Sequence, residues 1–181
     1  KKNVSKCLME ERKEAVLQEL KEKFDECKAD LGFEPSFEEI DSIFFVSDWV
    51  LESGFVSENF SRQLCKRIID TYGSWQNYFH NLVMPAPGYI PYMTESKAIG
   101  EDGKKDLLKL IAKIFNLITM NTEIGLNKDK TKEREFIDKS VRFWNDEFKE
   151  KAQEIMGKVR KGWENQINGV NRGKKDNVYS G

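Results

Sequence analysis

The single histidine and the three cysteines are the side chains that could act as a general base, a nucleophile or a soft metal ligand. His80 has no Ser or Cys companion at the spacing of a known catalytic motif, so the sequence predicts no catalytic triad. One histidine also excludes multi-histidine zinc and di-iron sites. Cys7, Cys27 and Cys65 lack the Cys-x-x-Cys spacing, and we interpret them as small buried side chains in a reducing compartment.

Two pairs of carboxylates have a spacing that suits a magnesium site. The first pair, Glu19 and Glu22, lies on one predicted helix, and the second pair, Glu38 and Asp41, lies on the next. The two members of each pair are three residues apart, so they share a face of their helix. The two motifs resemble the Glu-x-x-Glu and Glu-x-x-Asp motifs of all-α nucleotide pyrophosphohydrolases of the MazG type. The resemblance implies a magnesium-dependent nucleotide hydrolase. It is the third of three functional hypotheses, and otherwise we predict no catalytic residue, no cofactor and no metal.

The segment 84–103 breaks the periodic pattern and holds three of the four prolines. We predict a long proline-rich loop here, and such loops in compact helical domains are often functional. It carries Tyr89, Tyr92 and Met93, with His80 just before it. Two interpretations stand: a rigid recognition loop, or a segment that folds back and seals one end of the core.

The distal part of the last predicted helix is basic. Residues 151–181 carry seven basic and three acidic side chains, including Lys158, Arg160 and Lys161, and Trp163 is available for stacking. This pattern is the electrostatic footprint of nucleic-acid binding, although basic residues are also favoured at a helix C-terminus by the helix dipole. Nucleic-acid binding through this helix and its tail is therefore the second hypothesis.

The near-neutral charge of the whole chain conceals an uneven distribution. Residues 1–60 carry a net charge of −7 and residues 61–181 a net charge of +6, which gives −1 for the 181 residues. Complementary faces inside the fold would explain this division, and so would an anionic partner for the basic part.

The elements that position these residues are helices. Apolar residues recur at steps of three and four almost throughout, and no strand pattern is present. We predict an all-α, bundle-like single domain over 1–167, with an extended basic tail over 168–181. The expected helices, about six, cover roughly 5–31, 37–53, 58–72, 75–84, 103–125 and 130–167, the last being long.

No apolar run approaches the roughly 20 residues of a membrane helix, so we predict a soluble cytoplasmic protein that does not enter a membrane. The leading hypothesis is a protein-interaction or scaffold module that binds a protein partner or a second copy of itself. The contact residues would come from the loop and the distal helix: Tyr89, Tyr92, Met93, His80, Trp163, Lys158, Arg160 and Lys161.

Overall fold

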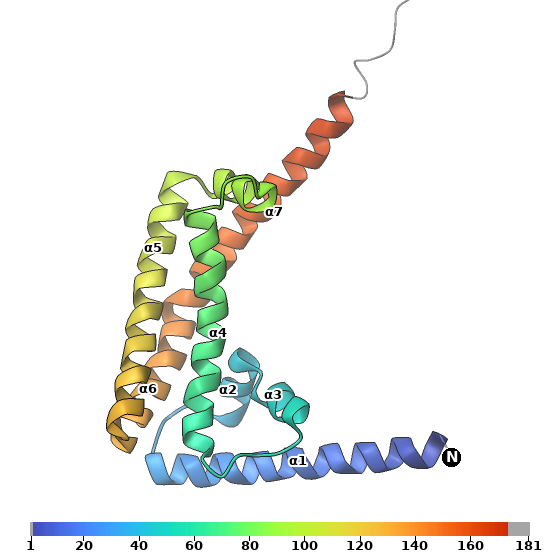
Figure 1. Ribbon diagram of the computed structural model, residues 1–181, viewed down its shortest axis with the longest axis vertical. Helices are drawn as coiled ribbons and strands as arrows, with labels where there is room; N and C mark the ends of the chain where they lie inside the picture. The colour runs from blue at the N-terminus through green and yellow to red at the C-terminus, as the bar shows by residue number, and fades with distance from the viewer. Residues whose placement is uncertain (1, 174–181) are drawn as a thin grey trace, which may run out of the picture. The chain divides into compact units, whose positions relative to one another are not determined.

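The computed structural model describes the backbone of residues 2–173 and the side chains of residues 10–168. The described residues form helices joined by short turns and include no β-strand, so the predicted all-α fold class is confirmed. None of these helices is long and apolar enough to cross a membrane. In chain order they are α1 (Lys2–Leu31), α2 (Phe37–Phe44), α3 (Val46–Ser53), α4 (Phe60–Val83), α5 (Ile90–Asn127), α6 (Lys130–Phe143), the π-helical segment η1 (Trp144–Phe148) and α7 (Lys149–Gly173), as Figure 1 shows.

The helices divide into two compact units, and each unit is built from two separate stretches of the chain. Unit 1 combines the residues up to Gly73 with Asn116–Trp144. Unit 2 combines Ser74–Phe115 with the residues from Asn145 onward. Helices α4 and α5 contribute to both units, because each boundary falls inside a helix rather than in a linker.

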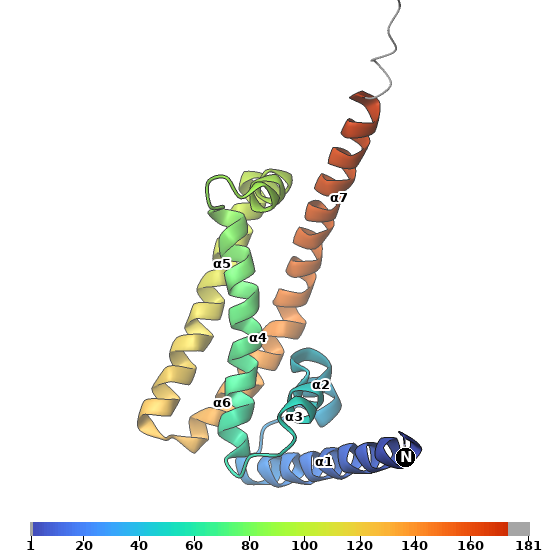
Figure 2. The ribbon, with the colours of Figure 1, turned by 45° about the vertical axis from the view of Figure 1, so that its right-hand side comes forward.

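Aromatic side chains form much of the core of unit 1. Phe24 of α1 makes edge-to-face contacts with Phe33 and Phe37, at ring-centroid distances of 5.4 and 5.2 Å. Phe44 contacts Tyr72 in the same manner at 5.9 Å. Helix α1 packs against α3 and α6 with its C-terminal half, whereas its N-terminal half extends away from the other helices of the unit (Figures 1 and 2).

The helix predicted over 37–53 is divided at Phe45, whose φ of 52° places it in the left-handed region. Ser36 caps α2 as predicted, because its Oγ accepts a hydrogen bond from the Glu39 N–H at 3.1 Å. The sequence analysis did not predict this division, because the side chain that caps α3, Asp41, lies inside the predicted helix 37–53. Asp41 accepts hydrogen bonds from the backbone N–H and the hydroxyl of Ser47, at 2.7 and 2.8 Å, and thereby caps α3.

Helix α4 continues through Gly73 and Ser74, where the sequence predicted one helix to end and another to begin. A glycine in a helix costs only about 1 kcal/mol relative to alanine. Burying an aromatic side chain contributes roughly 1.5–3 kcal/mol, and both Tyr72 and Phe79 are fully buried on either side of this point. In unit 2, the Phe79 ring lies 5.4 Å from Trp75 and 5.8 Å from Phe148.

The proline-rich loop is shorter than predicted, because residues 90–99 are helical and only residues 84–89 connect α4 to α5. Pro91 is compatible with this helix because it occupies the first turn, where the missing N–H would have no partner in any case. Gly100 has φ 68° and ψ 179°, so the axis of α5 is interrupted there. The segment 90–99 is therefore a short separate helix rather than part of an irregular loop.

The long C-terminal helix is confirmed. Asp129 caps its first part, α6, by accepting hydrogen bonds from the N–H groups of Thr131 and Lys132. The π-helical η1 joins α6 to α7 without a turn. Helix α7 runs to Gly173, so residues 168–173, which were expected to be extended, are helical, and the rest of the predicted tail lies outside the described residues.

Candidate functional site

Exposed apolar side chains gather where α4 leads into α5. Met84, Tyr89, Ile90 and Met93 are exposed by 67, 51, 69 and 37%. Single apolar residues on a surface are common, whereas several in one short segment are typical of a binding surface. We refer to these four residues as the 84–93 surface.

Ile90 and Met93 share one face of the short helix 90–99, because they are three residues apart. Lys97 lies one turn beyond Met93 on this face and is also exposed. The apolar face thus ends at a positive charge.

A hydrogen-bonded carboxylate fixes the segment that carries this surface. Glu95 of α5 accepts one hydrogen bond from the Tyr78 hydroxyl of α4, at 3.2 Å, and another from Trp163 Nε1 of α7, at 3.1 Å. Gln166 of α7 also donates to the hydroxyl of the buried Thr94, at 3.3 Å. Three helices of unit 2 are therefore linked behind the 84–93 surface.

Burial, the negative charge of Glu95 and the hydrogen bond to its carboxylate raise the pKa of Tyr78 well above the usual value for tyrosine. Tyr78 therefore stays a neutral hydrogen-bond donor at physiological pH. Its ring also lies 6.3 Å from that of Tyr92, which in turn lies 4.8 Å from Tyr89. The aromatic rings and the carboxylate support the segment on its inner side.

The helix 90–99 also approaches α7 very closely. A Cβ atom added to Gly162 would lie 2.5 Å from Cβ of Ala98, well inside the normal contact distance between carbon atoms. Gly162 is therefore required for this approach because it has no side chain. The close contact and the bonds to Glu95 hold the 84–93 surface on a fixed support.

The structure brings most of the aromatic residues of the predicted site together in unit 2. Tyr89, Tyr92 and Met93 belong to the segment, and Trp163 is bound to it through Glu95. His80 is exposed on the last turn of α4, and its carbonyl accepts the Met84 N–H at 2.8 Å. Sequence reasoning missed Glu95, since nothing local distinguishes it among 31 acidic residues.

The basic residues of the predicted site are mostly paired with acidic neighbours on α7. Lys158 lies 2.9 Å from Glu154, and Arg160 lies 3.8 Å from Glu164. Lys161 is exposed and forms no ion pair with any residue that the structure describes. These pairs partly neutralise the charges of Lys158 and Arg160 locally without changing the net charge of the helix, and nucleic-acid binding stays a prediction.

The part of the chain that the structure describes contains no group of three or more His, Cys, Asp or Glu side chains that could hold a metal ion. The structure therefore does not assemble the predicted magnesium site from Glu19, Glu22, Glu38 and Asp41. The hydrogen bonds of Asp41 to Ser47 instead give this carboxylate a structural role as the cap of α3.

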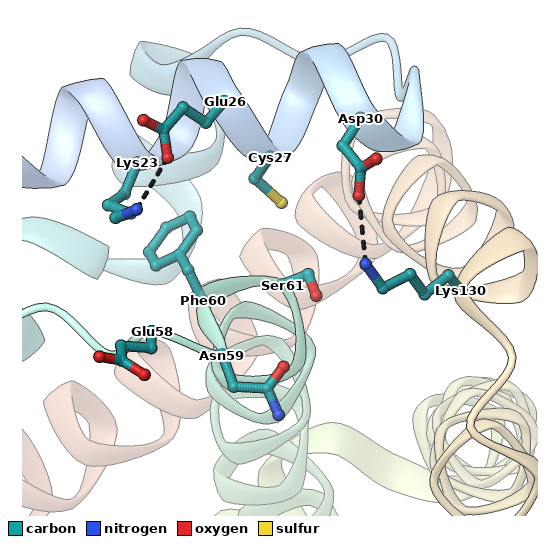
Figure 3. Close-up of a pocket in the computed structure, with 9 residues that line it drawn as sticks. All are labelled: Lys23, Glu26, Cys27, Asp30, Glu58, Asn59, Phe60, Ser61 and Lys130. Carbon is teal, nitrogen blue, oxygen red and sulfur yellow. Dashed lines mark hydrogen bonds and ion pairs between the residues drawn. The ribbon is translucent and has the colours of Figure 1, made fainter.

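Unit 1 contains a second region of interest, a surface cavity of about 290 Å³ between α1 and the start of α4 (Figure 3). Two ion pairs border it. Lys23 lies 2.8 Å from Glu26, and Lys130 of α6 lies 3.3 Å from Asp30. Cys27 points from α1 into the space between them.

The two cysteines whose side chains the structure describes, Cys27 and Cys65, are not activated as nucleophiles. Burial, followed by the negative charge of Glu133, raises the pKa of Cys27 to about 11 and that of Cys65 to about 12. Both are therefore protonated thiols at neutral pH, whereas nucleophilic attack needs the thiolate. The side chain of Cys7 lies outside the described residues.

The chain matches no protein-family model, no curated protein sequence and no solved structure. The two regions above, one in each unit, are therefore the basis for assigning a function.

Proposed function

We propose that this chain is a protein-interaction module and that the 84–93 surface is its contact site. The observation that carries the proposal is the exposure of four large apolar side chains within a single supported segment. Apolar and aromatic anchors supply most of the binding free energy in protein interfaces. A surface with Met, Tyr and Ile side chains has this composition.

The rigidity of the segment supports the proposal. Pro85, Pro87 and Pro91 restrict its backbone, and the hydrogen bonds to Glu95 fix its helical part against α4 and α7. A segment that is already ordered loses little conformational entropy on binding. The free energy gained when a partner buries these exposed side chains is therefore offset by only a small entropic cost of ordering the segment.

The partner that fits this surface is an amphipathic helix with an acidic residue beside its apolar face. The apolar side chains would cover Ile90 and Met93, and the acidic residue would face Lys97 one turn further along. A charge at the rim of an interface mainly fixes orientation and increases the association rate.

A peptide selection tests this proposal. Helical peptides would be selected from a displayed library against the full chain, and their affinities measured by fluorescence anisotropy. The Ile90→Glu substitution is expected to lower the affinity for the selected peptides at least tenfold, because it places a charge in the centre of the surface. Leu126→Glu is the matched control, since Leu126 is exposed by 78% but lies in unit 1.

Equal affinity of the unmodified chain and the Ile90→Glu variant would refute the contact site. So would a loss of affinity in Leu126→Glu as large as that in Ile90→Glu. Light scattering provides the remaining distinction: a dimer that Ile90→Glu abolishes would show that a second copy of this chain, rather than a helical partner, covers the surface.

A further inference from the structure

Helix α3 of unit 1 carries a second surface with exposed aromatic side chains. Four residues, counted from the N-cap of the helix at steps of three and four, share one of its faces: Phe45, Asp48, Trp49 and Glu52. Val46 and Val50 lie on the inner face and are fully buried, so the four residues form the outer one. We refer to these four residues as the α3 face.

Phe45 is exposed by 54%, and its ring contacts no other aromatic ring that the structure describes. Its φ of 52° lies in the left-handed region, which glycine or asparagine adopts more readily than a bulky residue. The backbone bonds of Phe45, to the Asp41 carbonyl at 2.8 Å and from the Trp49 N–H at 3.1 Å, need no particular side chain. Neither burial nor backbone geometry therefore explains a phenylalanine here, whereas contact with a partner would.

The α3 face also carries two unpaired carboxylates. Asp48 and Glu52 are exposed and form no hydrogen bond or ion pair with any residue that the structure describes. Arg67 of α4 donates to the Phe44 carbonyl at 2.6 Å rather than to either carboxylate. Positions 29–61 of the sequence hold eight acidic residues and no basic one, so the chain places no cation beside them locally.

Aromatic rings next to carboxylates suit the guanidinium group of arginine. This group is planar, stacks on aromatic rings and donates paired hydrogen bonds to a carboxylate. Residues three or four apart on a helix have Cβ atoms about 5–6 Å from each other, so one guanidinium can contact the Trp49 ring and a neighbouring carboxylate together. The ammonium group of lysine is strongly hydrated and lacks this planar geometry.

We propose that the α3 face is a docking site for a basic segment of a partner protein. Arginine side chains of that segment would stack on Phe45 and Trp49 and pair with Asp48 and Glu52. Charge complementarity identifies the partner, because an acidic segment would be repelled and an apolar one would leave both carboxylates unpaired. The site lies in unit 1 and does not rest on the 84–93 surface, which belongs to unit 2.

Fluorescence anisotropy with the full chain tests the chemistry of this site. Two labelled peptides of equal length would be compared, in which either arginine or lysine alternates with serine. The arginine peptide should bind at least about threefold more tightly, because only the guanidinium group stacks on the rings and pairs with a carboxylate at once. Equal affinities of the two peptides, or no binding of the arginine peptide at about 1 mM, would overturn the proposal.

A matched pair of double variants tests the role of the carboxylates. Asp48→Asn combined with Glu52→Gln should lower the affinity for the arginine peptide by about tenfold, since two exposed ion pairs are lost. Glu123→Gln combined with Glu135→Gln removes the same charge from exposed positions of α5 and α6 in the same unit and should leave the affinity unchanged. An equal loss in the two double variants would show that the peptide responds only to the net charge of the chain, and would refute the site.

A second pair of variants tests the aromatic contact. Phe45→Asn keeps a residue that tolerates the left-handed backbone and should lower the affinity for the arginine peptide at least about threefold. Leu126→Asn, at a position of the same unit that is exposed by 78%, is the control and should have no effect. Unchanged binding by Phe45→Asn would refute the role of its ring.

Light scattering tests the alternative that a second copy of this chain covers the α3 face. The unmodified chain and the variant with Asp48→Asn and Glu52→Gln should have the same oligomeric state. A dimer that these two substitutions abolish would overturn the separate partner, because a basic surface of the second copy would then be the occupant.

Discussion

Replacement of Gly162 by alanine tests whether the close approach of α7 to the helix 90–99 is a real constraint. The new methyl carbon would lie 2.5 Å from Cβ of Ala98, whereas carbon atoms in contact prefer about 3.5–4.0 Å. The two helices must therefore separate by about 1 Å, or one of them must rotate. Gly157 provides the matched control, because a methyl group there meets no atom within 4 Å.

The comparison of the two variants isolates the steric cost. Both positions lie in the interior of α7, so alanine gains about 1 kcal/mol of helix propensity at each of them. Overpacking at a close contact costs about 1–3 kcal/mol. Gly157→Ala should therefore be stabilised by about 1 kcal/mol, and Gly162→Ala should be less stable than Gly157→Ala by about 1–3 kcal/mol.

Urea unfolding followed by circular dichroism gives both free energies. The fluorescence of Trp163, one residue from the substitution, should also change in Gly162→Ala, because a shift of the helix 90–99 alters its hydrogen bond to Glu95. If both variants are stabilised equally and this fluorescence is unchanged, the helices are not in close contact at Gly162, and the support of the 84–93 surface was inferred incorrectly.

Three further predictions concern unit 1. Asp41→Ala should lower the free energy of unfolding by about 1 kcal/mol in urea titration, because it removes the cap on Ser47; no loss would contradict the capping role. Tyr72→Phe should cost about 1 kcal/mol in the same assay, because its hydroxyl donates to the Ser140 carbonyl at 2.7 Å, and an unchanged stability would show that this bond contributes nothing. Burial raises the pKa of Cys65 from 9.0 to about 12, so its contribution to stability is complete below about pH 9 and is lost as the pH rises through about 12. Relative to Cys65→Ala, the free energy of unfolding of the unmodified chain should fall by up to about 1.4 kcal/mol per pH unit between pH 9 and 12. Parallel pH profiles of the two proteins would refute the raised pKa of Cys65.

The fold class could be predicted because its signal is local. Apolar residues at steps of three and four mark a buried helix face without reference to the rest of the chain. The predicted helix boundaries were wrong at two places, where long-range packing or the position of a proline within the first helical turn determines whether the helix continues. Burial of Tyr72 and Phe79 carries α4 through Gly73, and Pro91 is accepted because it lies in the first turn of α5.

The candidate site could be predicted only in part, for the same reason. Tyr89 and Met93 are conspicuous because large apolar residues beside prolines are unusual in a connecting segment. The hydrogen bonds that support them join Glu95 to Trp163, which lies 68 residues away in the chain. No spacing rule identifies such a pair, because the tertiary fold alone brings the two residues together.

The burial of Glu133 was equally inaccessible to sequence reasoning. Acidic residues are favoured in the first turn of any helix, so Glu133 at the start of α6 has an ordinary local explanation. Its unusual property is that the surrounding residues of unit 1 bury one carboxylate oxygen without supplying a donor.

The interleaving of the two units constrains how the candidate site must be studied. The boundaries of the units fall inside α4 at Gly73, inside α5 at Phe115 and within the helical run from α6 to α7 at Trp144. A cut at any of these points would create new helix ends whose backbone groups have no partner. Each unit also needs both of its chain stretches for its core, since Tyr72 bonds to Ser140 in unit 1 and Glu95 to Trp163 in unit 2. Neither unit can therefore be excised as one continuous segment, and point substitutions in the full chain are the proper way to test the role of the 84–93 surface.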